Sequence, residues 1–253
     1  MEAFKLSIAT ILARKTFVIW LVLLVVGTLL FPNLVPWEER PGLLQPARAQ
    51  TAWSILWVII LGWGLYQAAS FGDRWSSDGI LEYLKAMKKG RYAHLVQLWA
   101  SCMVFLLAFL AVGLGLTLLT TMPGDSQEAR MWVMTNLQYA VLFILAMAPL
   151  LVVAIALGTR LNVTAAYCLT AGLALHGLFG VGYLDFFLSQ SSSAFLDFLF
   201  VISPHYHLAD LTDRLVFKMG ALDGPSFLRI ATYLTGLGLL NVTAGLVLYR
   251  ERK

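Results

Sequence analysis

Six long apolar runs are the feature that most limits what this chain can fold into. About 20 apolar residues are needed for a helix to cross the hydrocarbon core of a bilayer. Of the 253 residues, 59% are hydrophobic and only 13% are charged, which leaves too little polar surface to cover a soluble core of this size. The sequence therefore predicts an all-α integral membrane protein, with residues 1–253 forming a single membrane domain. The expected spans are approximately Phe17–Val35, Ala52–Phe71, Leu95–Thr121, Trp132–Leu157, Val163–Leu184 and Phe227–Tyr249.

Residues 1–15 precede the first span and have amphipathic spacing. An apolar stripe recurs at helical intervals from Phe4 to Leu12, and Lys5, Arg14 and Lys15 lie off it. This pattern is typical of a helix that lies in the membrane interface. We expect such an interfacial helix before the first span, with the start of that span itself as the alternative.

The interval 72–91 is the long charged stretch between two spans, and it also has helical spacing. Ser77 or Asp78 can cap a helix at its start, and Gly90 can end it. Apolar residues fall on one side of this helix and charged residues largely on the other. The apolar set is Ile80, Leu81, Leu84 and Met87, and the charged set is Glu82, Lys85, Lys88 and Lys89.

The distribution of Lys and Arg predicts the orientation of the chain. If the N-terminus lies inside, twelve of the 18 basic residues fall on inner segments, and the other six fall on outer segments. Inner loops carry the excess of Lys and Arg in membrane proteins, so both termini are predicted to be cytoplasmic. The segment 185–226 is then an outer connection. Within it, the apolar piece Phe186–Ile202 is interrupted at Ser189–Ser193, which predicts a half-helix or a re-entrant helical hairpin rather than a full span.

Several kinds of chemistry lack their motifs in this sequence. It has no Gly-Lys-Ser/Thr phosphate loop, no His-Glu-x-x-His and no Gly-x-Ser-x-Gly. We therefore expect no enzyme activity in the chain itself and no cofactor bound by it. No array of aromatic and basic residues suggests nucleic-acid binding, and the basic residues beside apolar runs suit contact with the lipid bilayer.

Polar residues in or near the spans are candidates for a transport pathway. His176, Tyr183 and Asp185 are the first candidates, and Gln67 and Asn136 follow, with pairing between spans as the alternative. A metal site on His205, His207 and Asp210 is a weaker alternative, because spacing fixes no third strong ligand. If this stretch is helical, His207 and Asp210 face the same way, and a hydrogen-bonded structural cluster on an outer helix is then the preferred interpretation.

This layout resembles the permease of a type-2 ATP-binding-cassette (ABC) transporter over essentially the whole chain. One local match is Ser77-Asp78-Gly79 with Glu82, Leu84 and Arg91, which is similar to the charged coupling segment of that family. The other runs from Ser203-Pro204-His205 through Gly220-Ala-Leu-Asp223 to Tyr249-Arg-Glu-Arg-Lys253. It is similar to permeases grouped with gliding-motility and copper-processing exporters.

The resemblance implies a transporter subunit in the plasma (inner) membrane, with export as the favoured direction. Two permease chains, in a homodimer or heterodimer, would form the pathway, and separate ABC ATPase subunits would bind ATP and Mg²⁺. The residues implied in coupling to the ATPase are Asp78, Leu81, Glu82, Leu84, Lys85, Met87 and Lys88. The alternatives are a membrane scaffold without transport and, less favoured, a metal-dependent membrane enzyme.

Overall fold

The computed structural model describes residues 2–34, 41–77, 91–190 and 193–249 of the chain. Within these ranges the protein is all-helical and has no strand. Six of the described helices are long and apolar enough to cross a membrane, which confirms the predicted multi-pass membrane architecture. They cover Thr16–Leu34, Leu44–Ser77, Tyr92–Thr120, Ser126–Gly158, Val163–Gln190 and Gly224–Leu248.

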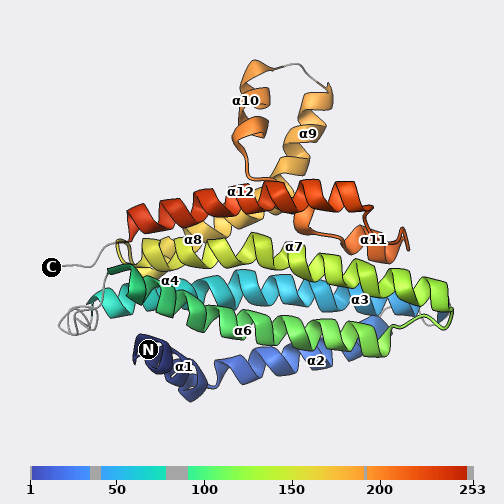
Figure 1. Cartoon of the computed structure of the whole chain (residues 1–253), viewed down its shortest axis with the longest axis horizontal. Helices are drawn as coiled ribbons and strands as arrows, with labels where there is room; N and C mark the ends of the chain where they lie inside the picture. The colour runs from blue at the N-terminus through green and yellow to red at the C-terminus, as the bar shows by residue number, and fades with distance from the viewer. Residues whose placement is uncertain (1, 35–40, 78–90, 191–192, 250–253) are drawn as a thin grey trace.

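Figure 1 shows the order of the described elements along the chain. Two of the spans contain π-helical turns, η1 and η2, and a 3₁₀ turn, η3, precedes the short helix α11. The bounds are α1 Glu2–Arg14, α2 Thr16–Leu34, α3 Pro41–Val58, η1 Ile59–Gly64, α4 Leu65–Ser77, α6 Arg91–Thr120, α7 Ser126–Gly158, α8 Val163–Leu175, η2 His176–Gly180, α9 Val181–Gln190, α10 Ala194–Ile202, η3 Tyr206–Ala209, α11 Thr212–Val216 and α12 Gly224–Leu248.

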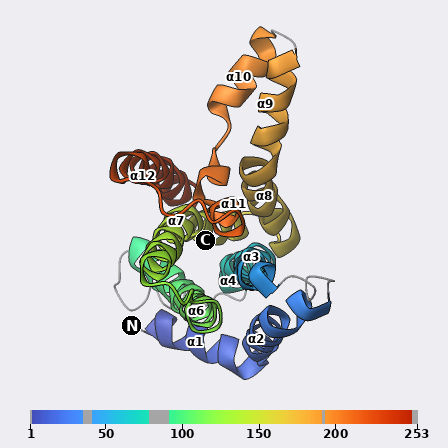
Figure 2. The same cartoon turned by 90° about the vertical axis from the view of Figure 1, so that its right-hand side faces the viewer.

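Two spans form the centre of the bundle. We compared how many residues are buried in an 18-residue apolar stretch of each span. The buried share is 78% in the continuous α3–η1–α4 span and 67% in α7, but only 22% in α2 and 17% in α12. Viewed along the bundle, α1 and α2 lie on one side of this centre, and α8 and α12 lie on the other (Figure 2). The peripheral helices therefore present wide apolar faces outward, as expected for helices whose surroundings are lipid or another membrane protein.

Two spans differ in extent from their predicted ranges. The second span begins at Pro41 and ends at Ser77, whereas the predicted range was Ala52–Phe71. Polar residues at both ends remain helical here because Gln45 donates a hydrogen bond to Thr121 O (2.5 Å) and Asp73 contacts the start of α8. Tertiary contacts thus extend a helix beyond its apolar run.

The fifth span is also not one regular helix. The prediction was a span from Val163 to Leu184, but the helix passes through the π-helical turn η2 at His176–Gly180. Beyond this turn α9 leaves the side of the bundle, and α10 returns beside it, so the two helices form a hairpin that stands away from the spans (Figures 1 and 2). The bounds of α9 at Gln190 and of α10 at Ala194 lie beside the serine-rich stretch Ser189–Ser193, part of which is outside the described residues.

Helices α4 and α7 make backbone contact at two glycines. A Cβ atom added to Gly158 would lie 2.3 Å from Ala69 O, and one added to Gly72 would lie 2.0 Å from Ile155 O. No other residue type fits either place without separating the helices. Small residues at a crossing point allow this close approach between membrane helices.

Gly158→Ala should therefore destabilise the protein. The new methyl group would push α4 away from α7, and overpacking of this kind costs about 1–3 kcal/mol. We expect a melting temperature several degrees lower by circular dichroism in detergent. Gly172→Ala in α8 is the matched control because a Cβ atom there meets nothing within 4 Å. Equal melting temperatures for the two variants would contradict this account of the contact.

Candidate functional site

The end of α4 at Ser77 is fixed to the connection between α7 and α8. Asp73 Oδ2 accepts a hydrogen bond from the backbone N–H of Val163 at 3.1 Å. Ser76 Oγ donates to Thr159 O at 3.5 Å. Together with the contact between Gly72 and Gly158, these bonds hold the last turn of α4 against two other spans.

Arg160 extends this attachment to α12. Its guanidinium donates to the carbonyls of Leu248 and, at 3.1 Å, Val247, at the C-terminal end of that helix. A cation at this position also interacts favourably with the helix dipole. We call the set Gly72, Asp73, Ser76, Gly158, Thr159, Arg160 and Val163 the inner junction, because it lies at the end that the sequence predicts to be cytoplasmic. It joins α4, α7, α8 and α12 at the same end of the bundle as α1 (Figure 1).

The predicted coupling residues follow directly after this junction in the sequence. Asp78, Leu81, Glu82, Leu84, Lys85, Met87 and Lys88 all lie in 78–90, outside the described residues. The structure does describe what flanks them. Helix α4 ends at Ser77 in the inner junction, and α6 begins at Arg91.

A second set of polar contacts lies toward the other end of the bundle and centres on Tyr139 in α7. The Tyr139 hydroxyl donates to Asp210 Oδ1 at 2.5 Å, and Trp57 Nε1 donates to that hydroxyl at 2.9 Å. The Tyr139 ring stacks on Trp53 with centroids 3.8 Å apart and an interplanar angle of 10°. Thr212 Oγ1 also lies 2.9 Å from the hydroxyl. We call Trp53, Trp57, Tyr139, Asp210 and Thr212 the outer cluster.

Neighbouring polar residues continue the outer cluster along α7. Trp53 Nε1 donates to Asn136 Oδ1 at 2.9 Å, so Asn136 pairs between spans, which was the alternative to a pathway role. Gln138 exchanges two hydrogen bonds with the backbone of Leu222, at 2.9 and 2.8 Å. The connection that follows η3 is thus attached to α7 at two places. The sequence signal for this attachment is the presence of Asn136, Gln138 and Tyr139 within one apolar run.

The predicted pathway residues do not meet at one place. His176 Nε2 lies 2.9 Å from Ser203 Oγ. This contact lies at the base of the hairpin, just before α9 and just after α10. Tyr183 and Asp185 are further along α9 and are both exposed, Tyr183 to 68%. Their separation follows from the turn η2, which directs α9 away from the spans.

The three weaker metal candidates also separate. The interpretation that placed His207 and Asp210 on one face of a helix is wrong, because η3 ends at Ala209 and the chain is extended at Asp210. Asp210 belongs to the outer cluster. His205 and His207 lie together with ring centroids 5.4 Å apart, and His205 Nε2 is 3.1 Å from Phe200 O. Across the described ranges, no group of three or more His, Cys, Asp or Glu residues is arranged to hold a metal ion.

Protonation of His207 is disfavoured in the folded protein. Partial burial lowers its pKa from the usual 6.5, and the neighbouring His205 lowers that pKa further. Its Nδ1 atom is buried and has no hydrogen-bond partner within the described part of the chain. Beside it, Tyr206 accepts a hydrogen bond from Asn241 Nδ2 at 2.7 Å, and burial raises the pKa of Tyr206 to about 12.

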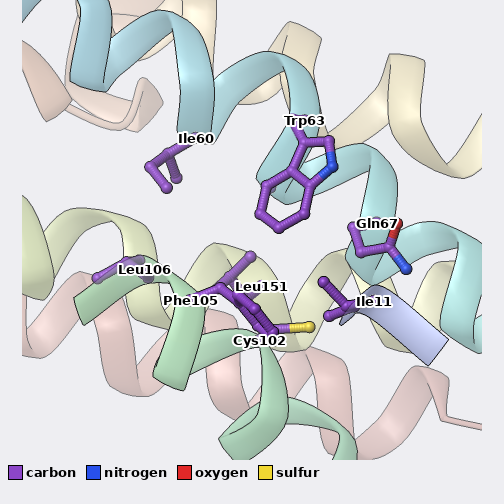
Figure 3. Close-up of a pocket in the computed structure, with 9 residues that line it drawn as sticks. Ile11, Ile60, Trp63, Gln67, Cys102, Phe105, Leu106 and Leu151 are labelled. Carbon is purple, nitrogen blue, oxygen red and sulfur yellow. The ribbon is translucent and has the colours of Figure 1, made fainter. Parts of the chain in front are cut away.

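Gln67 lines a small cavity beside the π-helical turn η1. Figure 3 shows Gln67 beside Ile11 and Trp63, and these residues border the space together with Cys102. Gln67 Nε2 is buried without a partner among the described residues, and the cavity measures about 10 Å³, which is close to the volume that one water centre requires. This space is too small for a transported molecule. It marks a loosely packed place in the middle of the α3–η1–α4 span.

Comparison of the chain with protein-family models, with curated proteins and with solved structures gives no match. The functional interpretation therefore rests on the residues and their arrangement.

Tyr139→Phe should destabilise the bundle without altering its hydrophobic packing. The variant keeps the ring that stacks on Trp53, but it leaves the Trp57 indole N–H and Asp210 without the hydroxyl. Loss of one partner from a buried hydrogen bond costs about 1–3 kcal/mol. We expect a melting temperature lower by several degrees. Tyr66→Phe is the control because Tyr66 is 41% exposed. A Tyr139→Phe protein as stable as this control would contradict the role given to the outer cluster.

His207 should make the stability of the protein depend on pH. Since its folded-state pKa lies below 6.5, the unfolded chain binds more protons between these two values. Its contribution is fully present above pH 6.5 and is lost as pH falls toward the folded-state pKa. We expect the fall in melting temperature between pH 7.5 and 5 to be smaller in His207→Gln.

The control for this measurement is Tyr206→Phe, which removes a hydrogen bond at the same place. Tyr206 does not titrate in this range, so that variant should lose the same stability at both pH values. An unchanged pH dependence in His207→Gln would show that other groups are responsible.

Proposed function

We propose that this chain is the membrane-spanning permease subunit of an ABC transporter. In this proposal the energy comes from Mg²⁺-ATP bound by a separate ATPase subunit, and two permease chains work together. The observation that carries the proposal is the inner junction. It fixes α4, whose last residue precedes the charged segment 78–90, to α7, α8 and α12.

The mechanical argument starts from what a coupling segment requires. A push on such a segment is useful only if the connection behind it is stiff, because a flexible connection would absorb the movement. At the inner junction, the contact between Gly72 and Gly158 and the bond from Val163 N–H to Asp73 leave little room for independent motion of α4. A displacement of 78–90 would therefore tilt several spans together.

The same two central spans continue to the outer cluster. Helix α7 runs from Ser126 to Gly158 and carries Tyr139, and the α3–η1–α4 span carries Trp53 and Trp57. Between the two ends, η1 and the cavity at Gln67 supply a place where the second span can adjust its winding. We infer that movement at the inner junction reaches the outer cluster through these paired spans.

The placement of the chain in the membrane follows from the same proposal. With both termini and 78–90 on the cytoplasmic side, the inner junction faces the ATPase, and the hairpin lies nearer the opposite side. Export remains the favoured direction. The aromatic surface of the hairpin is compatible with an amphipathic substrate.

Replacing Leu84 and Met87 together by Asp should abolish association with the cognate ATPase. In the proposal these side chains enter an apolar cleft of the ATPase, and a carboxylate there would be desolvated without a partner. Co-purification from membranes measures the association, and we expect at least a tenfold loss. Lys5→Asp is the control because it changes an exposed charge on α1 at the same end of the molecule.

A second variant separates coupling from binding. Asp73→Asn weakens the inner junction but leaves 78–90 unchanged, so the ATPase should still bind and the complex should hydrolyse ATP with less stimulation over the ATPase alone. Undiminished association of the Leu84 and Met87 variant would contradict the coupling assignment. Association without any stimulation in the unmodified complex would instead favour the scaffold.

A further inference from the structure

The hairpin formed by α9 and α10 has almost no contact with the rest of its own chain. We call residues 181–190 and 193–202 the arm. No described residue of α10 is buried, and in α9 only Val181 is buried. Figures 1 and 2 show the arm leaving the side of the bundle in both views. Many of its large side chains can therefore contact another molecule.

The exposed surface of the arm is strongly apolar and aromatic. The side chains that are more than half exposed are Tyr183, Phe186, Phe187, Phe195, Phe198, Val201 and Ile202, and Phe179 lies just before them. An aromatic side chain has roughly 200 Å² of surface. The exposed parts of these six aromatic side chains, together with those of Val201 and Ile202, therefore add up to an area on the order of 800 Å². This is the area, about 800 Å², that each partner buries in a stable protein–protein interface.

The direction of the arm is fixed at its base. A Cβ atom added to Gly177 would lie 2.4 Å from Pro204 O and 2.4 Å from the Tyr206 ring, so the two ends of the arm meet there without a gap. The backbone N–H of His205 donates to the Tyr233 hydroxyl at 3.1 Å, and Asn241 holds Tyr206. These contacts at the base direct the arm away from its own bundle. The exposure of its apolar side chains therefore results from the packing of the chain itself.

The base is attached within the depth of a span. Tyr233 and Asn241 are both inside α12, which runs from Gly224 to Leu248 and has the length of a full crossing. An arm that leaves sideways at this depth enters the bilayer. It carries two carboxylates, Asp185 and Asp197, and no Lys or Arg occurs from 161 to 213. Burying carboxylates in hydrocarbon without a partner is costly, so contact with lipid alone would not stabilise Asp185 and Asp197.

We propose that the arm packs against a second copy of this chain. A twofold pair buries both arms by the same contact, because each copy supplies an arm and receives one. The chain also supplies a complementary surface at the required depth. Helix α12 is only 17% buried over its apolar window, and its exposed Arg229 lies one turn from Tyr233, where it can meet the carboxylates of an incoming arm.

This inference deepens the proposed function, which requires two permease chains, and commits it to a homodimer. Its test needs no ATPase, so the two proposals can fail separately. The arm contact would fail if the chain is monomeric, whereas the permease assignment fails if no ATPase associates.

The experiment places a photo-crosslinking phenylalanine analogue at Phe198 in the full chain, in native membranes. Irradiation should give an adduct of twice the 28.0 kDa chain whose peptides all come from this sequence. The same analogue at Leu119, which is 86% exposed on α6 outside the arm, should give at least tenfold less adduct. No dimer adduct from Phe198, or one only to lipid or to another protein, would overturn the proposal.

A second measurement does not depend on crosslinking chemistry. In lipid nanodiscs, native mass spectrometry should show the unmodified chain as a dimer. The double variant Phe187→Ala and Phe198→Ala should be mainly monomeric, and Leu119→Ala should remain dimeric. Circular dichroism first verifies that each variant retains its helical content. A dimeric double variant, or a monomeric unmodified chain, would overturn the proposal.

Discussion

The backbone contact between Gly72 and Gly158 determines how the two central spans are placed. In hydrocarbon, membrane helices gain little from simply hiding apolar surface, so close packing and interhelical hydrogen bonds hold them together. Once α4 touches α7 here, Asp73 can reach the start of α8, and Ser76 can reach Thr159 O. The inner junction thus depends on glycine at positions 72 and 158, where a Cβ atom would not fit.

The polar contacts at the opposite end serve a different element. Tyr139, Trp57 and Asp210 attach the connection after η3 to the central spans, and this connection also forms the base of the arm. The bundle is therefore stiff at the inner junction and at the outer cluster, with a π-helical turn and a small cavity between them. In the proposed permease, these attached ends and the π-helical turn between them would let movement pass along the two central spans.

Sequence patterns predicted the spans well because the bilayer imposes a length of apolar helix that no tertiary contact can change. The same patterns were poorer at the ends of the spans. Gln45 and Asp73 lie outside the predicted range Ala52–Phe71, yet their hydrogen bonds to other spans keep α3 and α4 helical at these positions. The predicted grouping of His207 with Asp210 failed, because Asp210 accepts a hydrogen bond from Tyr139 instead.

The sequence by itself determined an all-helical membrane protein with six candidate spans, because the length of an apolar run is a local property of the chain. Only the tertiary structure decided which polar residues meet. Tyr139 and Asp210 are 71 positions apart, and no local pattern encodes such a pair. The structure alone also directed the arm away from the bundle, because that direction depends on how Gly177, Pro204 and Tyr206 pack.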